Sequence, residues 1–391
     1  MRVEHDRLTV AVYSVTGLWG WFLYSFGPSV PLLRDEQGTS RAVAGLHGTA
    51  LAVGAVLSAA VSVAAVRRIG RRGVLVVGTC GVLVGVLGLV LAPGLPWTVL
   101  AVLLIGLGGS TSFNAVSPVL SAHHHEAGPA AITEANGVAA TVGILAPLAV
   151  GASVALGLSW RGAVAVGVPL AVLAVVLVLR APTSDALVGD PPRRSSTDSP
   201  LPHRFWLALG VVTCCIAVEF CLTFWVGDLL RQRTGVSSGT AAALISVLIA
   251  GMAIGRFSGA RLTGRFGIEP LLLGAIALAL AGWLLVWVAT DPALAVAGLL
   301  VVGLGISVQF PLALARLLRA SGGRTDAAAS WASLGAGVAS GGAPFALGAI
   351  SDVVGSHRGF VLVPALLLVA AGGVIVAPSV KVFGDIGERW P

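Results

Sequence analysis

Residues 63–72 read V-A-A-V-R-R-I-G-R-R, and residues 260–267, which lie 197 positions later, read A-R-L-T-G-R-F-G. An arginine and a glycine therefore recur in the same register. Other pairs separated by 197 positions are Leu32-Leu33-Arg34 and Leu229-Leu230-Arg231, Ala146-Pro147 and Ala343-Pro344, and Arg161-Gly162 and Arg358-Gly359. Matches at arginine and proline in one constant register are hard to obtain by chance, so the chain contains a long internal repeat.

The composition excludes a soluble globular protein. Of 391 residues, 56% are hydrophobic and 10% are charged, and the mean hydropathy is +0.95. Soluble domains carry about 25% charged residues, so this chain cannot cover a water-facing surface. The formal net charge is +7, but the arginines stand in short loops between apolar runs. They therefore indicate membrane topology rather than nucleic-acid binding.

Apolar runs of about 20 residues are long enough, as helices, to cross roughly 30 Å of hydrocarbon. The sequence predicts twelve of them, six in each repeat. They are Leu8–Leu33, Ala42–Val66, Val74–Ala92, Trp97–Leu120, Ala130–Leu156, Ala163–Leu179, Phe205–Leu230, Thr240–Phe257, Leu271–Ala289, Ala293–Leu318, Ala327–Ile350 and Phe360–Val376. We therefore expect an all-α membrane protein built from two parallel six-helix bundles, residues 1–180 and 205–391. Residues 181–204, rich in proline and serine, are expected to form a flexible linker.

The distribution of arginine and lysine predicts the orientation. With the N-terminus inside, 18 of the 24 basic residues fall on the inner segments and 6 on the outer segments. This bias favours a cytoplasmic location for both termini and the linker, in a cytoplasmic (inner) membrane. Asp228 and Asp352 lie near outer ends and are expected to be solvated.

Six spans, a linker, six more spans and an arginine-rich second-to-third loop together resemble the major facilitator superfamily, over the whole chain. The family loop G-x-L-x-D-R-x-G-R-R is matched at its end by Arg68, Gly70, Arg71 and Arg72, while Arg67 stands where the family has Asp. The second copy retains Arg265 and Gly267. The resemblance implies a solute transporter that works by alternating access, with these loops at its inner gate.

Within the family, the resemblance does not select one branch. Drug/proton antiporters usually carry an arginine in the fourth span, and Trp97–Leu120 has none. Residues 114–118 and 310–313 are similar to permeases of the cyanate or nitroimidazole type. The subfamily therefore stays open.

One carboxylate inside a span points to chemistry. Glu219 lies near the middle of the seventh span, and a charge at that depth costs roughly 2.5–3.5 kcal/mol on insertion scales. It is expected either to exchange a proton or pair with a cationic substrate, or to be neutralised by a neighbouring helix, for which Arg256 is the candidate. Arg256 itself is expected to reach the inner surface or to pair with an acidic helix end.

In the superfamily, spans one, four, seven and ten line a central cavity, and this chain has polar and aromatic side chains on all four. The candidate substrate residues are Trp21, Tyr24, Phe113, Asn114, Thr223, Trp225, Gln309 and Phe310. Aromatic rings supply contact area, and hydroxyl and amide groups orient a small solute.

Other residues have candidate roles in movement. Glu134, early in the fifth span, is expected either to contact the inner gate or to complement the positive end of its helix. Pro147 and Pro344 stand on matching helices, where each frees a backbone carbonyl and permits bending as a hinge. His123-His124-His125 is expected to be a solvated loop, so we predict no metal site.

These observations favour a secondary active transporter for a small organic solute, with protons as the coupling ion, no cofactor, no catalytic site and a monomeric state. Two alternatives stay open. One is an efflux antiporter for amphipathic compounds or drugs. The other is a receptor of the same fold that does not transport.

Overall fold

The computed structural model describes residues 3–188, 201–322 and 324–377, and over these ranges the chain is helical, with no β-strand. The helices of the first half are α1 (Arg7–Gln37), α2 (Arg41–Leu91), α3 (Leu95–His124), the 3-10 turn η1 (His125–Ala127), α4 (Gly128–Ala155), α5 (Ser159–Ala165), α6 (Gly167–Arg180) and α7 (Asp185–Val188). Those of the second half are α8 (His203–Thr234), α9 (Ser238–Phe266), α10 (Ile268–Val288), α11 (Pro292–Ile306), α12 (Gln309–Ala320), α13 (Thr325–Val354), α14 (Ser356–Gly359) and α15 (Leu362–Val376).

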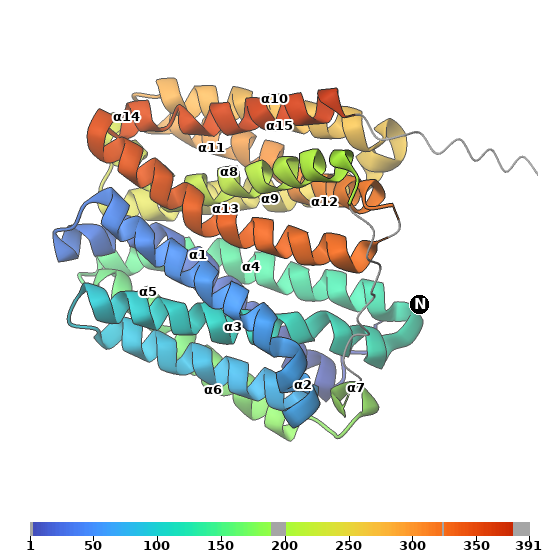
Figure 1. Ribbon diagram of the computed structural model, residues 1–391. Coiled ribbons are helices and arrows are strands. Elements are labelled where there is room, and N and C mark those ends of the chain that lie inside the picture. Colours follow the sequence, from blue (N-terminus) through green and yellow to red (C-terminus); the bar gives the residue numbers. More distant parts are fainter. Residues whose placement is uncertain (1–2, 189–200, 323, 378–391) are drawn as a thin grey trace, which may run out of the picture.

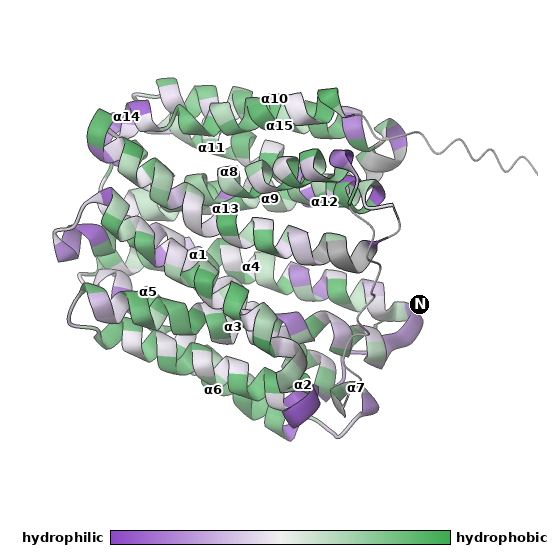
Figure 2. Ribbon diagram, in the orientation of Figure 1, coloured by the Kyte–Doolittle hydropathy of each residue, from purple (hydrophilic) through white to green (hydrophobic). Residues whose placement is uncertain are grey.

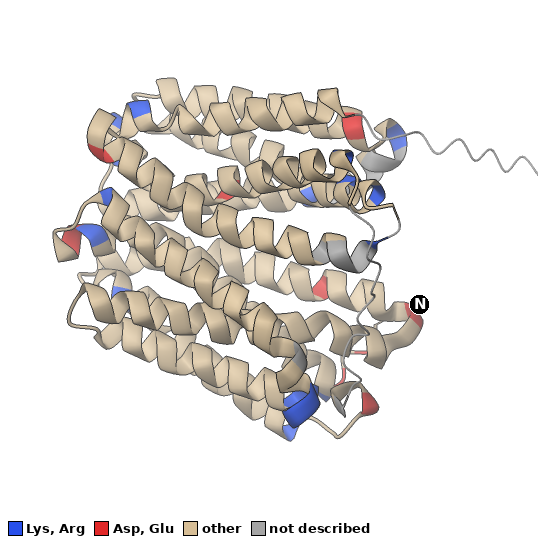
Figure 3. Cartoon of the chain, viewed as in Figure 1, with Lys and Arg blue, Asp and Glu red and all other residues tan. Residues whose placement is uncertain are grey.

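The two halves are two helical bundles that lie side by side. In Figure 1 the first half fills the lower part of the view and the second half the upper part, and between them α2 packs against α13 and α4 against α9. Apolar residues dominate the middle of the helices, whereas polar and charged residues gather at the two ends of the bundle (Figures 2 and 3). This distribution is the one that a membrane-spanning helix bundle requires.

The twelve predicted spans are all helical, with interruptions that the sequence did not indicate. The described residues contain ten segments long and apolar enough to cross a membrane, of which Leu95–Ala155 holds two predicted spans. Helix α1, the first predicted span, is not among the ten. The sixth and tenth spans are each divided into two consecutive helices, and the short helix α14 directly precedes the twelfth.

The arginine-rich loops turn as predicted. Gly70 has φ 67° and ψ 172° and bends α2 into its two spans, and Gly267 has φ 79° and ψ 172° between α9 and α10. Both glycines adopt a left-handed backbone that side chains other than glycine rarely tolerate. We call this end of the bundle the Gly70 end. The opposite end, where Gly38 and Gly235 separate α1 from α2 and α8 from α9, is the Gly38 end.

Part of the predicted linker is packed rather than flexible. Ala186 and Leu187, in the short helix α7, are 4% and 3% exposed, and Arg71 donates a hydrogen bond to the carbonyl of Ala186 at 3.0 Å. Two apolar side chains and a basic anchor are enough to hold this turn against the first half. Residues 189–200 of the linker and residues 378–391 at the C-terminal end of the second bundle lie outside the described residues.

Matching glycines bring the helices of each half together at equivalent points. The α carbon of Gly106 faces the backbone of Leu51, and that of Gly303 faces the backbone of Leu248, each so closely that a β carbon could not fit. Both pairs differ by the 197-residue offset. Small residues allow membrane helices to approach until their backbones touch, which maximises dispersion contacts where no hydrophobic driving force acts.

The interface between the halves has the same pseudo-two-fold symmetry. Helix α2 packs against α13, and α9 packs against α4. Thr49 donates a hydrogen bond to the carbonyl of Gly341 at 3.0 Å, and Ser246 donates to the carbonyl of Ile144 at 2.8 Å. Each accepting carbonyl stands three residues before a helix proline, Pro344 or Pro147. The predicted hinge prolines therefore lie beside symmetric hydrogen bonds that join the two halves.

The buried apolar residues form one cluster that spans both halves and one that belongs to the first half alone. Phe26, Ala44 and Val150 share the larger cluster with Phe224 and Ile245 of the second half. The smaller cluster, which includes Leu8, Val74, Ala131 and Leu187, holds only first-half residues and lies toward the Gly70 end. The shared core thus joins the halves closer to the Gly38 end.

Replacing Gly106 by alanine tests the close helix contact. The added methyl group meets the backbone of Leu51, and overpacking of this kind costs about 1–3 kcal/mol. We expect Gly106→Ala to lower the thermal unfolding temperature of the purified protein. Gly274→Ala, on a position of α10 with open space around it, is the matched control and should leave the temperature unchanged or slightly raised. Equal unfolding temperatures for the two variants would contradict the packing described here.

Candidate functional site

Three ionisable side chains from three helices meet about halfway along α8. Glu219 lies there, and Nη2 of Arg256 on α9 is 4.0 Å from its Oε1. The carboxyl side chain is 19% exposed and the guanidinium side chain 43% exposed. The sequence named both residues, and the structure brings them together. Of the two sequence interpretations of Glu219, neutralisation by Arg256 therefore has a geometric basis.

Tyr24 extends this group across the interface between the halves. It belongs to α1 of the first half and interacts electrostatically with Glu219 and Arg256 of the second half. Its ring lies against Gly143 of α4, where an added β carbon would be 2.5 Å from the ring atom Cδ2. Gly143 therefore fixes how far the tyrosine ring stands from α4. We call Tyr24, Glu219 and Arg256 the charge cluster.

A break in the tenth span supplies the remaining partner of Arg256. Residues Ser307 and Val308 interrupt the helix between α11 and α12, and Nε of Arg256 points at the carbonyl oxygen of Ser307 at 3.4 Å. The Ser307 hydroxyl donates to the carbonyl of Leu304, a local bond that competes with regular helix pairing. The equivalent region of the first half lies inside the continuous helix α3, so this break is a property of the second half alone.

Three of the predicted cavity residues are instead buried in helix packing. Trp21 donates its indole N–H to Ala163 of α5, and Trp225 donates to Pro344 of α13. Gln309 is 1% exposed and points its amide at the carbonyl of Ala275 on α10. Each satisfies a polar group inside one half, so we leave all three out of the candidate site.

The other predicted cavity residues are placed differently. The Thr223 hydroxyl donates to the carbonyl of Glu219 at 2.9 Å, so it lies one turn from the charge cluster. Phe113 is half-buried, Asn114 is exposed and Phe310 is 37% exposed. No contact described for these last three joins them to the charge cluster.

A second group of charges, which the sequence missed, closes the Gly38 end. Asp228 of α8 is 3% exposed, and its carboxylate lies 3.1 Å from Nη1 of Arg34 and 2.9 Å from Nε of Arg41, both in the first half. Ser356 also donates to this carboxylate at 2.8 Å. The expectation of a solvated Asp228 is therefore wrong. Its burial arises because charged residues far apart in sequence converge, which no local pattern signals.

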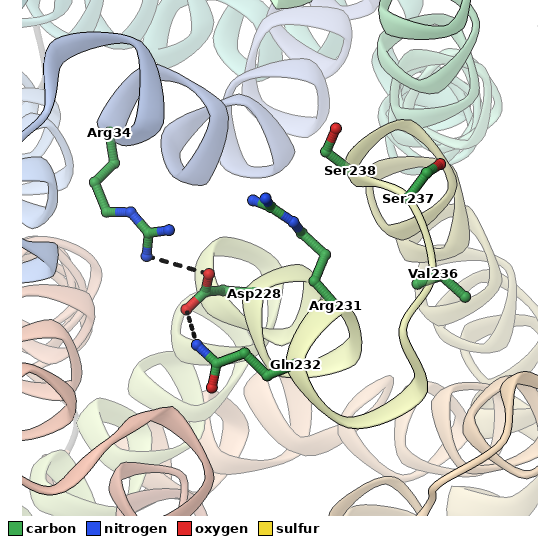
Figure 4. A pocket seen from close by; sticks show the side chains of 7 residues that line it. All are labelled: Arg34, Asp228, Arg231, Gln232, Val236, Ser237 and Ser238. Carbon is green, nitrogen blue, oxygen red and sulfur yellow. Dashed lines mark hydrogen bonds and ion pairs between the residues drawn. The ribbon is translucent and has the colours of Figure 1, made fainter.

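Two further pairs cross between the halves at the same end. Asp352 of α13 accepts hydrogen bonds from the backbone N–H groups of Arg41 and Ala42, so it caps the first turn of α2 from the other half. Nη1 of Arg231 lies 2.6 Å from Asp35. Figure 4 shows Asp228 between Arg34 and Gln232, beside a pocket of about 390 Å³. We call Arg34, Asp35, Arg41, Asp228, Arg231 and Asp352 the clamp.

At the Gly70 end the predicted gating residues make contacts inside one half. Arg72 donates to carbonyl groups at the end of α6, and Arg68 and Arg265 are exposed. Glu134 lies beyond the first turn of α4 and accepts hydrogen bonds from His5 and Tyr13 of the same half. Glu134 is too far along α4 to complement the helix end, and the contacts described for it are within the first half, so its contact with an inner gate stays a prediction.

The histidine run belongs to a small polar group at the Gly70 end. His123 lies 2.8 Å from the carboxylate of Asp6, and His124 lies 2.8 Å from the hydroxyl of Thr9. Burial alone would raise the pKa of Asp6, but hydrogen bonds from Thr9 and His123 hold it below its ordinary value. Among the described residues no group of histidine, cysteine and carboxylate side chains is arranged to hold a metal ion.

Comparison with known proteins gives a consistent result. The sequence model of the family described as Major Facilitator Superfamily matches residues 12–344. A search of curated protein sequences returned no significant match.

Many solved structures share the fold at low sequence identity. A mutant of the nucleoside transporter NupG has a TM-score of 0.78 at 13% identity, covering 95% of this chain and 98% of that one. A D-xylose-proton symporter gives 0.76 at 14% identity, covering 96% and 98%. The peptide transporter POT in complex with sulfate gives 0.74 at 13% identity, covering 96% and 95%. Identities this low establish a common fold and leave the solute undefined.

Asp228→Asn tests the clamp. The variant removes the charge that faces Arg34 and Arg41, and a loss of about 1.4 kcal/mol already corresponds to a tenfold change in an equilibrium. We expect amide hydrogen exchange to accelerate by about tenfold in residues 34–45 and 228–240.

The matched control is Asp291→Asn at the N-cap of α11, where asparagine caps as well as aspartate. It should leave exchange in both segments unchanged. If Asp228→Asn exchanges like wild type, the clamp does not hold the Gly38 end closed.

Proposed function

The chain belongs to the major facilitator superfamily, and from this membership we propose that it is a secondary active transporter of a small organic solute. Its fold is shared with proteins described as nucleoside, sugar and peptide transporters. The proposal includes alternating access, in which the two bundles rock against each other around a site between them. It also includes coupling to protons through Glu219.

The observation that carries the proposal is the position of the charge cluster. It lies midway along the membrane helices and joins α1 of one bundle to α8 and α9 of the other. A mostly buried carboxyl paired with a single arginine at 4.0 Å can take up a proton when the pair separates. Rocking of the bundles changes the distance between Tyr24 and its two partners, which supplies a physical link between movement and protonation.

Closure at one end supports alternating access. The clamp joins the halves at the Gly38 end, whereas the polar contacts described at the Gly70 end stay within one half, such as Tyr13 with Glu134 in the first and Arg316 with Glu269 in the second. We propose that this conformation gives the solute access from the Gly70 end, and that the opposite conformation requires the clamp to open. The hydroxyl bonds from Thr49 and Ser246 beside Pro344 and Pro147 are candidates for the contacts that slide.

Orientation follows from the arginine distribution. We propose that the Gly70 end, which carries most of the basic residues, faces the cytoplasm. The conformation is then inward-facing, residues 1–180 and 205–391 are the two moving units, and the chain works as a monomer. Neither drug efflux nor a receptor role has a specific structural observation in its favour, and no catalytic role is proposed.

Replacing Glu219 by glutamine should separate proton coupling from solute binding. Glutamine keeps the size of the side chain but cannot carry the proton, so proton-driven accumulation in proteoliposomes should be lost while solute exchange continues. The measurement is uptake of a solute identified by a stabilisation screen, with and without an imposed pH gradient. Glu126→Gln, an exposed position in η1, is the matched control and should behave as wild type. Undiminished gradient-driven uptake by Glu219→Gln would remove Glu219 from the coupling step.

Gly143 offers an independent test of Tyr24. A methyl group at Gly143 must push the tyrosine ring away from α4, which displaces its hydroxyl within the charge cluster. We expect Gly143→Ala to reduce the transport rate by about tenfold, because a displacement of about 1 Å can cost up to a hundredfold in a positioned site. Gly137→Ala, two turns away on the same helix and in open space, should transport normally. Normal transport by both variants would show that the position of Tyr24 is unimportant.

A further inference from the structure

We infer that the charge cluster binds a small organic monoanion, a carboxylate, through the guanidinium of Arg256. This inference rests on the proposed function and adds the chemical class of the solute. It is carried by the number of free donors on Arg256, by the looseness of its pair with Glu219, and by the charge balance that the two residues impose on a membrane carrier.

Arg256 has more hydrogen-bond donors than its partners use. A guanidinium carries five N–H donors in a flat fork that matches the two oxygens of a carboxylate. One donor points at Ser307 at 3.4 Å, a second nitrogen faces Glu219 at 4.0 Å, and Tyr24 is the third neighbour, so at least two of the five donors are left for a ligand. With 43% of its side chain exposed, Arg256 still presents a face of the fork to an incoming ligand.

Glu219 makes only a weak interaction with the guanidinium of Arg256. Its oxygen lies 4.0 Å from Arg256, beyond the 2.7–3.2 Å of a normal N–H···O hydrogen bond. The pair therefore has coulombic attraction without a bidentate contact. A ligand carboxylate that reached hydrogen-bonding distance would bind Arg256 better than Glu219 does, and protonation of Glu219 would remove its competition.

Charge balance then couples the two ligands. The empty pair, Glu219 ionised and Arg256 charged, has no net charge. The pair with one proton and one monoanion also has none, whereas either ligand alone leaves one unpaired charge between membrane helices. Such a charge is unfavourable there, so the empty and the fully loaded carrier move more readily than the half-loaded forms. The expected transport is electroneutral, one proton with one anion.

A cationic solute fits the same geometry poorly. A cation that paired with Glu219 would lie within several ångströms of the guanidinium and be repelled by it. Acids on two of the helices around the cluster are already engaged, since Asp228 of α8 pairs with Arg34 and Arg41, and Glu134 of α4 bonds to His5 and Tyr13. The remaining titratable group described at the cluster is Tyr24, whose hydroxyl interacts with both partners.

The test uses sets of ligands that differ in charge but share a carbon skeleton. The purified protein is titrated with benzoate, benzamide and benzylamine, and with propionate, propionamide and propylamine, and thermal stabilisation is measured at mildly acidic and at neutral pH. We expect stabilisation by at least one carboxylate and by neither its amide nor its amine, and stronger binding at the acidic pH.

Variants locate the effect. Arg256→Gln should weaken carboxylate binding by about tenfold or more, and Arg256→Lys should recover part of it, since lysine keeps the charge but loses the fork. Glu219→Gln should bind carboxylates with no pH dependence. Arg180→Gln, on an exposed position at the end of α6, is the matched control. Should Arg256→Gln fold poorly, the pH dependence of Glu219→Gln still decides between the outcomes.

Three results overturn the inference: stabilisation by the amines or amides instead, no stabilisation by any carboxylate, or carboxylate binding that survives Arg256→Gln. Measurements of proton movement in proteoliposomes distinguish failure of this inference from failure of the proposed function. If amines or amides drive proton movement in proteoliposomes, the solute class is wrong and the carrier function stands. If a carboxylate binds through Arg256 but drives no proton movement, the binding site stands and the proposed coupling fails.

Discussion

A charged side chain between membrane helices requires a partner, and this requirement organises the interior of the molecule. Glu219 and Arg256 stand at mid-depth on neighbouring helices, where leaving either alone would cost several kcal/mol. Their pairing fixes the facing sides of α8 and α9. The carbonyl of Ser307 can accept from Arg256 because residue 311, four positions later, is proline and has no N–H to donate to it.

The two halves share a scaffold and differ at the site. Three features repeat at the 197-residue offset: the close contacts of Gly106 and Gly303, the turns at Gly70 and Gly267, and the hydroxyl bonds of Thr49 and Ser246. Helix packing, turns and the interface are therefore alike in the two halves. The charge cluster has no counterpart, since Phe22 stands opposite Glu219 in the repeat and Ala59 opposite Arg256. Symmetric parts suit rocking of equal bundles, and asymmetric parts suit recognition of an asymmetric solute.

In the proposed transport cycle the clamp closes the Gly38 end of the bundle, and the charge cluster binds ligands in its middle. Three cations and three anions at the Gly38 end pair across the halves, in groups that keep the end neutral when closed. Opening that end separates opposite charges but exposes them to water, where the cost is small. Charges at mid-depth are not exposed to bulk water in this way. In the proposed mechanism, binding and release of ligands at these charges can therefore control movement of the bundles.

The sequence alone determined the class of fold and the scaffold, because membrane helices require long apolar runs and the repeat marks itself by its constant offset. It also identified Glu219 and Arg256 as candidates, since a charge in an apolar run stands out wherever it falls, while Tyr24 was named through the family resemblance, which places the first span at the cavity. Only the tertiary structure decided that these three meet, that Trp21, Trp225 and Gln309 are packed away, and that Asp228 is buried in a clamp. Which way a side chain points, and which distant helix faces it, depends on rotation and packing of whole helices, and neither leaves a trace in local composition.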